Sequence, residues 1–91
     1  MKYRIEIEPL ADHYVVAAKD WTTGVVKETF SLNESGVDML RLFCEGDNTT
    51  EVSRKISEMY DAPLQLVSRD VLAFYDKLRQ KDLIENEKIS L

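Results

Sequence analysis

The fold of this chain is decided by residues 25–37, VVKETFSLNESGV, where a strand pattern changes into a helix pattern. Apolar Phe30 and Leu32 alternate with polar neighbours, which is the period of two expected of a half-buried strand. Asn33 then stands where a helix N-cap is expected, and Glu34 follows in the first turn, where the helix dipole favours an anion. The stretch therefore predicts a strand that ends just before Asn33 and a helix that begins directly after it.

Two further strands are predicted upstream. Residues 3–8 alternate apolar and charged side chains, and Pro9 is expected to end that strand because it cannot donate to a ladder. A second strand covers about residues 14–18, and the third covers about 24–31. Residues 19–24 carry the Asp, Thr and Gly typical of a hairpin loop. Together these segments predict a three-stranded antiparallel sheet.

The remaining sequence has the period of helices. The first predicted helix runs from the cap at Asn33 to a C-cap at Gly46, and its broad apolar arc indicates a central helix. The second opens at Asn48, three residues before Glu51, in the form of a capping box. The third starts at Pro63 and ends near Lys81. The predicted buried positions are Val52, Ile56, Met59 and Tyr60 in the second helix, and Leu64, Val67, Val71, Phe74, Tyr75 and Leu78 in the third, with Leu83 and Ile84 folding back behind it.

This order of elements predicts an α+β domain of the winged helix-turn-helix type. The sheet and the three helices are each apolar on one face and bury those faces on one another. The second and third helices have the layout of a helix-turn-helix, and the hairpin is the wing. Because 91 residues suffice for one core, we expect a single domain over 1–91 with its core in about 12–85.

Charge and hydropathy exclude several classes of partner. The net charge is −5, whereas nucleic-acid binding draws much of its affinity from Lys and Arg on phosphates. The longest mostly apolar stretch, residues 14–18, is far shorter than the roughly 20 residues of a membrane span. The first residues alternate charged and apolar side chains, unlike a signal peptide. We therefore expect a cytoplasmic protein that binds neither nucleic acid nor membrane.

The residue types needed for metal binding or catalysis are sparse. Cys44 is the only cysteine and His13 the only histidine, so neither a disulfide nor a thiolate metal cluster is expected. Cys44 falls on the apolar side of its helix and is expected to be buried. The three glycines are too far apart for a phosphate-binding loop. We expect no metal, no cofactor and no catalytic activity of the chain's own.

Several motifs resemble a known family when their order and separation are considered together. They are FSLNESG at residues 30–36, Gly46, TTEV at 49–52, DVLAF at 70–74, Leu78 and LI at 83–84. In this arrangement the chain resembles the PqqD family (coenzyme PQQ synthesis protein D) over about residues 12–85. One departure is Asp82, where the family usually has Gly. Asp tolerates the left-handed conformation expected there better than most residues do.

The resemblance implies a peptide chaperone. PqqD-like domains recognise the leader segment of ribosomally synthesised precursor peptides and present it to a modifying enzyme, often a radical SAM protein, in PQQ or related biosynthesis. If the third strand lies at a sheet edge, a peptide can add to it as a further strand, and the third helix would form the other wall of a groove. The peptide-binding residues expected from this are Val25, Val26, Lys27, Glu28, Thr29, Val67, Asp70, Val71, Phe74 and Leu78.

Other interpretations of the same residues remain open. Residues 25–29 also suit an edge strand protected by its own charges, and the apolar residues of the third helix suit the core. Asp70 suits either a peptide contact or a solvated helix position. Trp21 at the hairpin tip suits a partner contact or packing on its own hairpin.

Two alternative functions follow from the fold and composition. A winged-helix DNA-binding regulator would need a basic face on the third helix, but the charges there have mixed signs. A structural subunit of a synthase complex would need no peptide affinity. An exposed edge strand also allows a strand-swapped homodimer.

Overall fold

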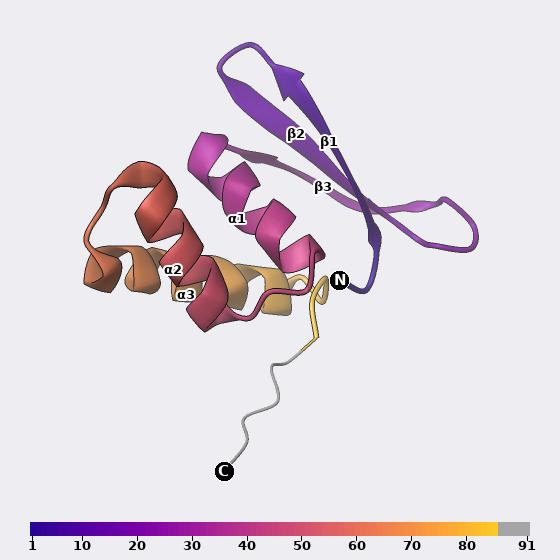
Figure 1. The fold of residues 1–91 in the computed structure, drawn as a ribbon. Helices are drawn as coiled ribbons and strands as arrows, with labels where there is room; N and C mark the ends of the chain where they lie inside the picture. The colour runs from indigo at the N-terminus through magenta and orange to yellow at the C-terminus, as the bar shows by residue number, and fades with distance from the viewer. Residues whose placement is uncertain (86–91) are drawn as a thin grey trace.

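The computed structural model describes residues 1–85, in which three strands precede three helices (Figure 1). The end of the expected domain, residues 86–91, lies outside the described residues. This arrangement confirms the predicted α+β class and order of elements. The elements are β1 (Arg4–Leu10), β2 (His13–Lys19), β3 (Val26–Leu32), α1 (Glu34–Cys44), α2 (Thr49–Tyr60) and α3 (Leu64–Gln80).

The sheet is antiparallel with the strand order β1-β2-β3, so β1 and β3 are its two edges. The prediction that Pro9 ends the first strand is wrong, because β1 continues to Leu10 with Pro9 in register with Tyr14. Proline is tolerated at an edge, where its missing N–H can face away from the neighbouring strand.

A β-bulge interrupts the pairing of β2 with β3. Ala18 lies opposite Glu28 and Lys19 opposite Val26, so Lys27 is the extra residue. A bulge bends its strand and disturbs the ladder locally. Regular pairing on β3 therefore runs from Glu28 to the end of the strand.

The hairpin between β2 and β3 is closed by a side chain. The carboxylate of Asp20 accepts hydrogen bonds from the backbone N–H groups of Thr22 and Thr23, both at 2.8 Å. Gly24 follows with φ +73°, a conformation that glycine adopts without strain. The backbone N–H of Asp20 then donates to the carbonyl of Val25 at 2.9 Å. The predicted hairpin loop is thus confirmed, and the backbone of Val25 belongs to the turn.

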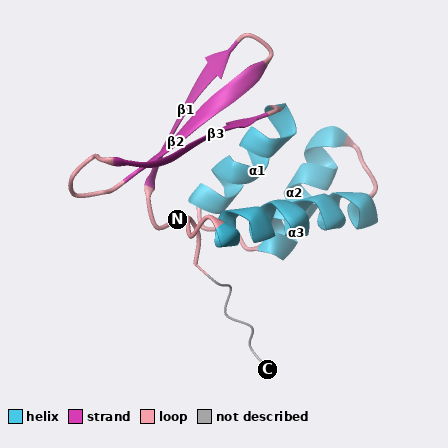
Figure 2. Ribbon diagram, turned by 180° about the vertical axis from the view of Figure 1, so that it is seen from behind, coloured by secondary structure: helices cyan, strands magenta, loops and turns pink. Residues whose placement is uncertain are grey.

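The core lies around α1, which packs against the sheet on one side and α2 on the other (Figures 1 and 2). The ring of Phe43 on α1 lies 6.3 Å from that of Phe74 and 5.7 Å from that of Tyr75, both on α3. This confirms the central position predicted for the first helix. The buried apolar residues are Val16, Ala18, Val37, Met39, Leu40, Phe43, Val52, Ile56, Val67, Val71, Tyr75, Leu78 and Leu83.

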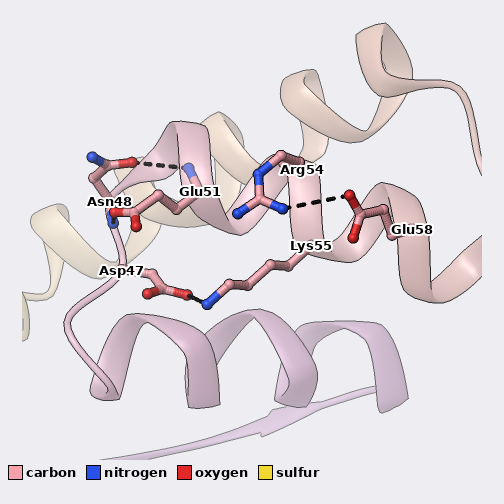
Figure 3. A network of polar contacts seen from close by, with 6 residues as sticks. All are labelled: Asp47, Asn48, Glu51, Arg54, Lys55 and Glu58. Carbon is pink, nitrogen blue, oxygen red and sulfur yellow. Dashed lines mark hydrogen bonds and ion pairs between the residues drawn. The ribbon is translucent and has the colours of Figure 1, made fainter.

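The start of α2 is held by the predicted capping box (Figure 3). The backbone N–H of Glu51 donates to Oδ1 of Asn48 at 2.8 Å, and the backbone N–H of Asn48 donates to Oε1 of Glu51 at 3.1 Å. Lys55, one turn further on, pairs with Asp47 at 2.7 Å. Two residues before the helix are therefore attached to it by side-chain contacts, so the chain enters α2 at a defined angle.

Several residues predicted to be buried are exposed because they lie in terminal turns of helices. Met59 and Tyr60 at the end of α2 are 56% and 42% exposed, and Leu64 at the start of α3 is 52% exposed. Cys44, the last residue of α1, is also exposed. Terminal turns extend past the core and have packing partners on fewer sides. The hydroxyl of Tyr60 instead donates to the carboxylate of Asp38 on α1.

The segment that follows α3 folds back onto the core. Asp82 adopts the expected left-handed conformation with φ +58°, and Leu83 follows with no exposed surface. The N–H of Leu83 donates to the carbonyl of Leu78 at 3.0 Å, while its own carbonyl accepts from the N–H of Lys2 at 2.9 Å. Lys2 also pairs with Asp82 at 2.7 Å. The two ends of the described chain therefore stabilise each other.

The buried Leu83 provides a test of this packing. We expect Leu83→Ala to lower the free energy of unfolding by about 2–5 kcal/mol, because it leaves a cavity where the chain folds back. Urea unfolding measures the change. Leu72→Ala, at a residue 54% exposed, is the matched control and should change stability by less than about 0.5 kcal/mol. Equal losses in the two variants would contradict the described position of Leu83.

The contact between Tyr60 and Asp38 predicts a pH effect. The hydrogen bond to Asp38, followed by burial, raises the pKa of Tyr60 to about 12 from 10.0. The folded state thus favours the neutral phenol of Tyr60. The contact between Tyr60 and Asp38 therefore stabilises the fold fully below pH 10.0, and this stabilisation is lost as the pH rises through about 12. We expect Asp38→Asn to bring the pKa of Tyr60 down toward its ordinary value, as measured by phenolate absorbance. An unchanged titration curve would contradict the contact.

Candidate functional site

A groove of about 470 Å³ lies where the end of β3, the start of α1 and the middle of α3 meet. Its lining combines apolar and polar side chains. Because β3 is an edge strand, one side of its backbone is unpaired within residues 1–85. The lining residues are Ser31, Leu32, Asn33, Ser35, Gly36, Met39, Asp70, Ala73, Phe74 and Lys77.

The junction between β3 and α1 builds one wall of the groove. Oδ1 of Asn33 accepts from the backbone N–H of Gly36 at 2.9 Å and from the hydroxyl of Ser35 at 3.1 Å, which caps α1 as predicted. A Cβ on Gly36 would lie 3.2 Å from that Oδ1 and 3.3 Å from the side chain of Leu32. Glycine at this position therefore lets the first turn of α1 approach the end of β3 closely.

One flank of α3 builds the opposite wall. Asp70, Ala73, Phe74 and Lys77 share this flank because their spacing follows the helical repeat. Phe74 is half-buried, with its ring against that of Phe43. Among the α3 residues in the predicted site, the structure thus brings Asp70 and Phe74 to the groove.

The other α3 residues in the predicted site lie in the core. Val67, Val71 and Leu78 are 6%, 0% and 1% exposed, respectively. They support the groove wall from behind and present almost no surface to a ligand. A direct peptide contact from α3 is therefore proposed only for the flank that carries Asp70 and Phe74.

The predicted strand residues divide between two places. Val25 precedes β3, and with Val26 and Lys27 it lines a separate hollow of about 480 Å³ beside the hairpin. Glu28 and Thr29 lie on the regularly paired part of β3, opposite Ala18 and Ala17, and Thr29 is exposed. The part of the edge that leads into the groove is thus shifted toward the end of β3 relative to the prediction.

A half-buried ion pair joins α3 to β3. Nζ of Lys81, just after α3, lies 2.7 Å from Oε1 of Glu28 and 5.4 Å from the ring centre of Phe30. Glu28 stands in the first half of β3, whereas Ser31 and Leu32 at its end face the middle of α3 across the groove. β3 and α3 therefore run in opposite directions along the groove, as Figure 1 shows.

Some groove residues were absent from the predicted site. Ala73 and Lys77 could have been found from the helical spacing, since they lie three and seven residues after Asp70. Leu32, Ser35 and Met39 could not, because only the packing of α1 on the sheet brings them opposite α3. The capping motif at Asn33 predicted where the turn between β3 and α1 lies, but it did not predict that this turn faces α3.

The groove combines several kinds of side chain. Its lining includes hydroxyl, amide and charged groups beside apolar side chains, with neither histidine nor cysteine among them.

The histidine and the cysteine of the chain lie away from the groove. Nδ1 of His13 lies 3.2 Å from Oδ1 of Asp12, beside the turn between β1 and β2. Cys44 is exposed, but partial desolvation by neighbouring atoms raises the pKa of its thiol. A smaller fraction of it is therefore the reactive thiolate at neutral pH.

Residues 1–85 carry neither a metal-ligand cluster nor a membrane-spanning helix. Within them, no group of three or more His, Cys, Asp or Glu side chains is placed to bind a metal ion. None of the helices described there has the length and apolar character to cross a membrane.

The fold and groove define a winged-helix-like α+β domain with an open sheet edge beside a helix. Residues 10–84 match the family model described as coenzyme PQQ synthesis protein D (PqqD), so the chain belongs to the PqqD family. This confirms the resemblance found in the sequence. A comparison with curated proteins gives no match.

One solved structure is similar to this chain over nearly its whole length. It is TbiB1 in complex with the TbiA(beta) leader peptide, with a TM-score of 0.69 and 25% sequence identity. The match covers 98% of this chain and 100% of TbiB1 in that structure. The fold described here is therefore similar to that of TbiB1 in its leader-peptide complex.

Proposed function

We propose that this protein is an adaptor that binds the leader segment of a ribosomally synthesised precursor peptide and presents it to a modifying enzyme. The observation that carries the proposal is the open edge of β3 beside the groove, in a fold shared with the leader-peptide complex of TbiB1. Membership of the PqqD family supports the same role.

The peptide adds to β3 as a further strand. Its backbone pairs with the outward N–H and C=O groups of residues 28–32, the regularly paired part of the edge. Alternate side chains of the peptide then face the groove, because side chains alternate across a strand. Leu32 and Phe74 offer apolar surface there, so an apolar peptide side chain is the natural occupant of the groove centre.

The partners follow from this role. Neither histidine nor cysteine lines the groove, and the PqqD family suggests that a second protein, a radical SAM enzyme, modifies the bound peptide. PQQ assembly is one such pathway, and another peptide-derived product is equally compatible with these residues. A second copy of this chain would compete for the same edge of β3 in a strand-swapped dimer.

The charges on α3 do not favour the DNA-binding alternative. Arg79 pairs with Asp76 at 2.8 Å, and Lys81 with Glu28 at 2.7 Å, so part of the basic charge is already neutralised. Asp70 lies between Arg69 and Lys77 along the helix. A recognition helix needs free cationic side chains on one face, and this mixture of signs would repel phosphates as well as attract them.

An amide-resolved NMR titration tests the proposal. The labelled full chain is titrated with the leader region of a precursor peptide encoded beside its gene. We expect saturable shifts at residues 28–32 and along 70–77. A folded spectrum without shifts at near-millimolar peptide would contradict direct binding and favour a structural subunit instead.

A substitution in the groove sharpens this test. We expect Phe74→Ala to weaken peptide binding about tenfold, equivalent to about 1.4 kcal/mol, because it removes the aromatic ring that lines the groove. Leu72→Ala on the same helix is the control, since Leu72 lines a different hollow between α2 and α3 and should leave the Kd unchanged. Equal Kd values for both variants and the unmodified chain would contradict this placement of the peptide.

A further inference from the structure

Two charged residues of the groove have no ion-pair partner within residues 1–85. Asp70 and Lys77 line opposite ends of its α3 wall, and none of the ion pairs formed there includes either of them. Their neighbours are paired, since Arg79 contacts Asp76 and Lys81 contacts Glu28. Within the described residues, the groove therefore carries one free negative and one free positive charge, with Ala73 and Phe74 between them.

The spacing of these charges suits an extended peptide. Seven residues of helix place Asp70 and Lys77 about 10.5 Å apart along the axis of α3. An extended chain advances about 3.3 Å per residue, so peptide side chains two and four residues apart on one face lie about 7 and 13 Å apart. The flexible side chains of Lys, Arg and Glu are long enough to bridge the difference of about 3 Å between either peptide spacing and the spacing of Asp70 and Lys77. One strand can thus reach both charges and the apolar residues Ala73 and Phe74 between them.

The direction of the peptide follows from the arrangement of β3 and α3. The sheet is antiparallel throughout residues 1–85, and antiparallel pairing is slightly more stable per residue than parallel pairing. A strand added antiparallel to β3 runs parallel to α3, because β3 and α3 run in opposite directions (Figure 1). Its N-terminal part then lies near Asp70 and its C-terminal part near Lys77.

We propose that the groove selects leader peptides by the order of their charges. Given the peptide-binding role proposed above, it selects a basic residue, then an apolar residue, then an acidic residue, from N- to C-terminus. Asp70 contacts the basic side chain, Phe74 the apolar one and Lys77 the acidic one. Asp70 and Lys77 are exposed, and exposed charges add little affinity. Placing like charges together is costly, so this pair acts mainly on specificity.

Selection from a displayed library of random peptides tests the proposal and does not require the precursor to be identified. The full chain is compared with a double variant, Asp70→Lys with Lys77→Asp, which keeps the net charge. We expect the unmodified chain to enrich the order basic, apolar, acidic, and the double variant to enrich the reverse. For a peptide selected on the unmodified chain, exchanging its two charges should weaken binding roughly tenfold, because each charge then lies beside a like charge.

A second double variant serves as the matched control. Asp76→Arg with Arg79→Asp reverses an ion pair outside the groove lining and also keeps the net charge. It should enrich the same charge order as the unmodified chain. A change of order in this control as large as that in the groove variant would overturn the assignment to Asp70 and Lys77.

The remaining outcomes separate this inference from the proposed function. Enriched peptides that shift the amides of residues 28–32 but show no common charge order would overturn the inference and leave the peptide-binding role intact. The reverse charge order on the unmodified chain would also overturn it. Failure to enrich any peptide that shifts these amides would contradict both proposals.

Discussion

The arrangement of this domain depends on the turn between β3 and α1. Strand and helix are separated by Asn33 alone, whose side chain accepts the N–H of Gly36 at 2.9 Å. With so short a connection, the direction of α1 relative to the sheet is set by this cap and by the close approach that Gly36 permits. Since α1 packs on both the sheet and α2, an error in this turn would displace each of them.

The groove is a consequence of where α3 is attached. Phe43 on α1 holds the middle of α3 through Phe74 and Tyr75, and the Lys81–Glu28 pair holds its end against β3. The groove separates the flank of α3 that carries Asp70, Ala73 and Lys77 from the end of β3. The buried Leu83 keeps the end of α3 in place. The open space is therefore maintained by rigid packing around it.

The sequence predicted those features that depend on local chemistry. The caps at Asn33 and Asn48 were predicted because each side chain accepts the backbone N–H three residues further on, and the left-handed Asp82 was expected from the family resemblance. The periodicity of apolar residues predicted every strand and helix. It overestimated burial in the terminal turns of helices, as the exposed Tyr60 shows, because a helical repeat carries no information about where the core ends.

The candidate site could be predicted only in part, because it is built from β3, α1 and α3, which are distant in the sequence. Asp70 and Phe74 were named from their motif, yet the flank of α3 that faces β3 depends on contacts between distant segments. The bulge at Lys27 likewise shifts the usable edge toward the end of β3, and no residue type nearby indicates it. Backbone pairing along β3 is nearly independent of peptide sequence, since every residue except proline offers the same N–H and C=O groups. Discrimination among peptides must therefore come from side chains beside the edge, and in this chain the flank of α3 provides them.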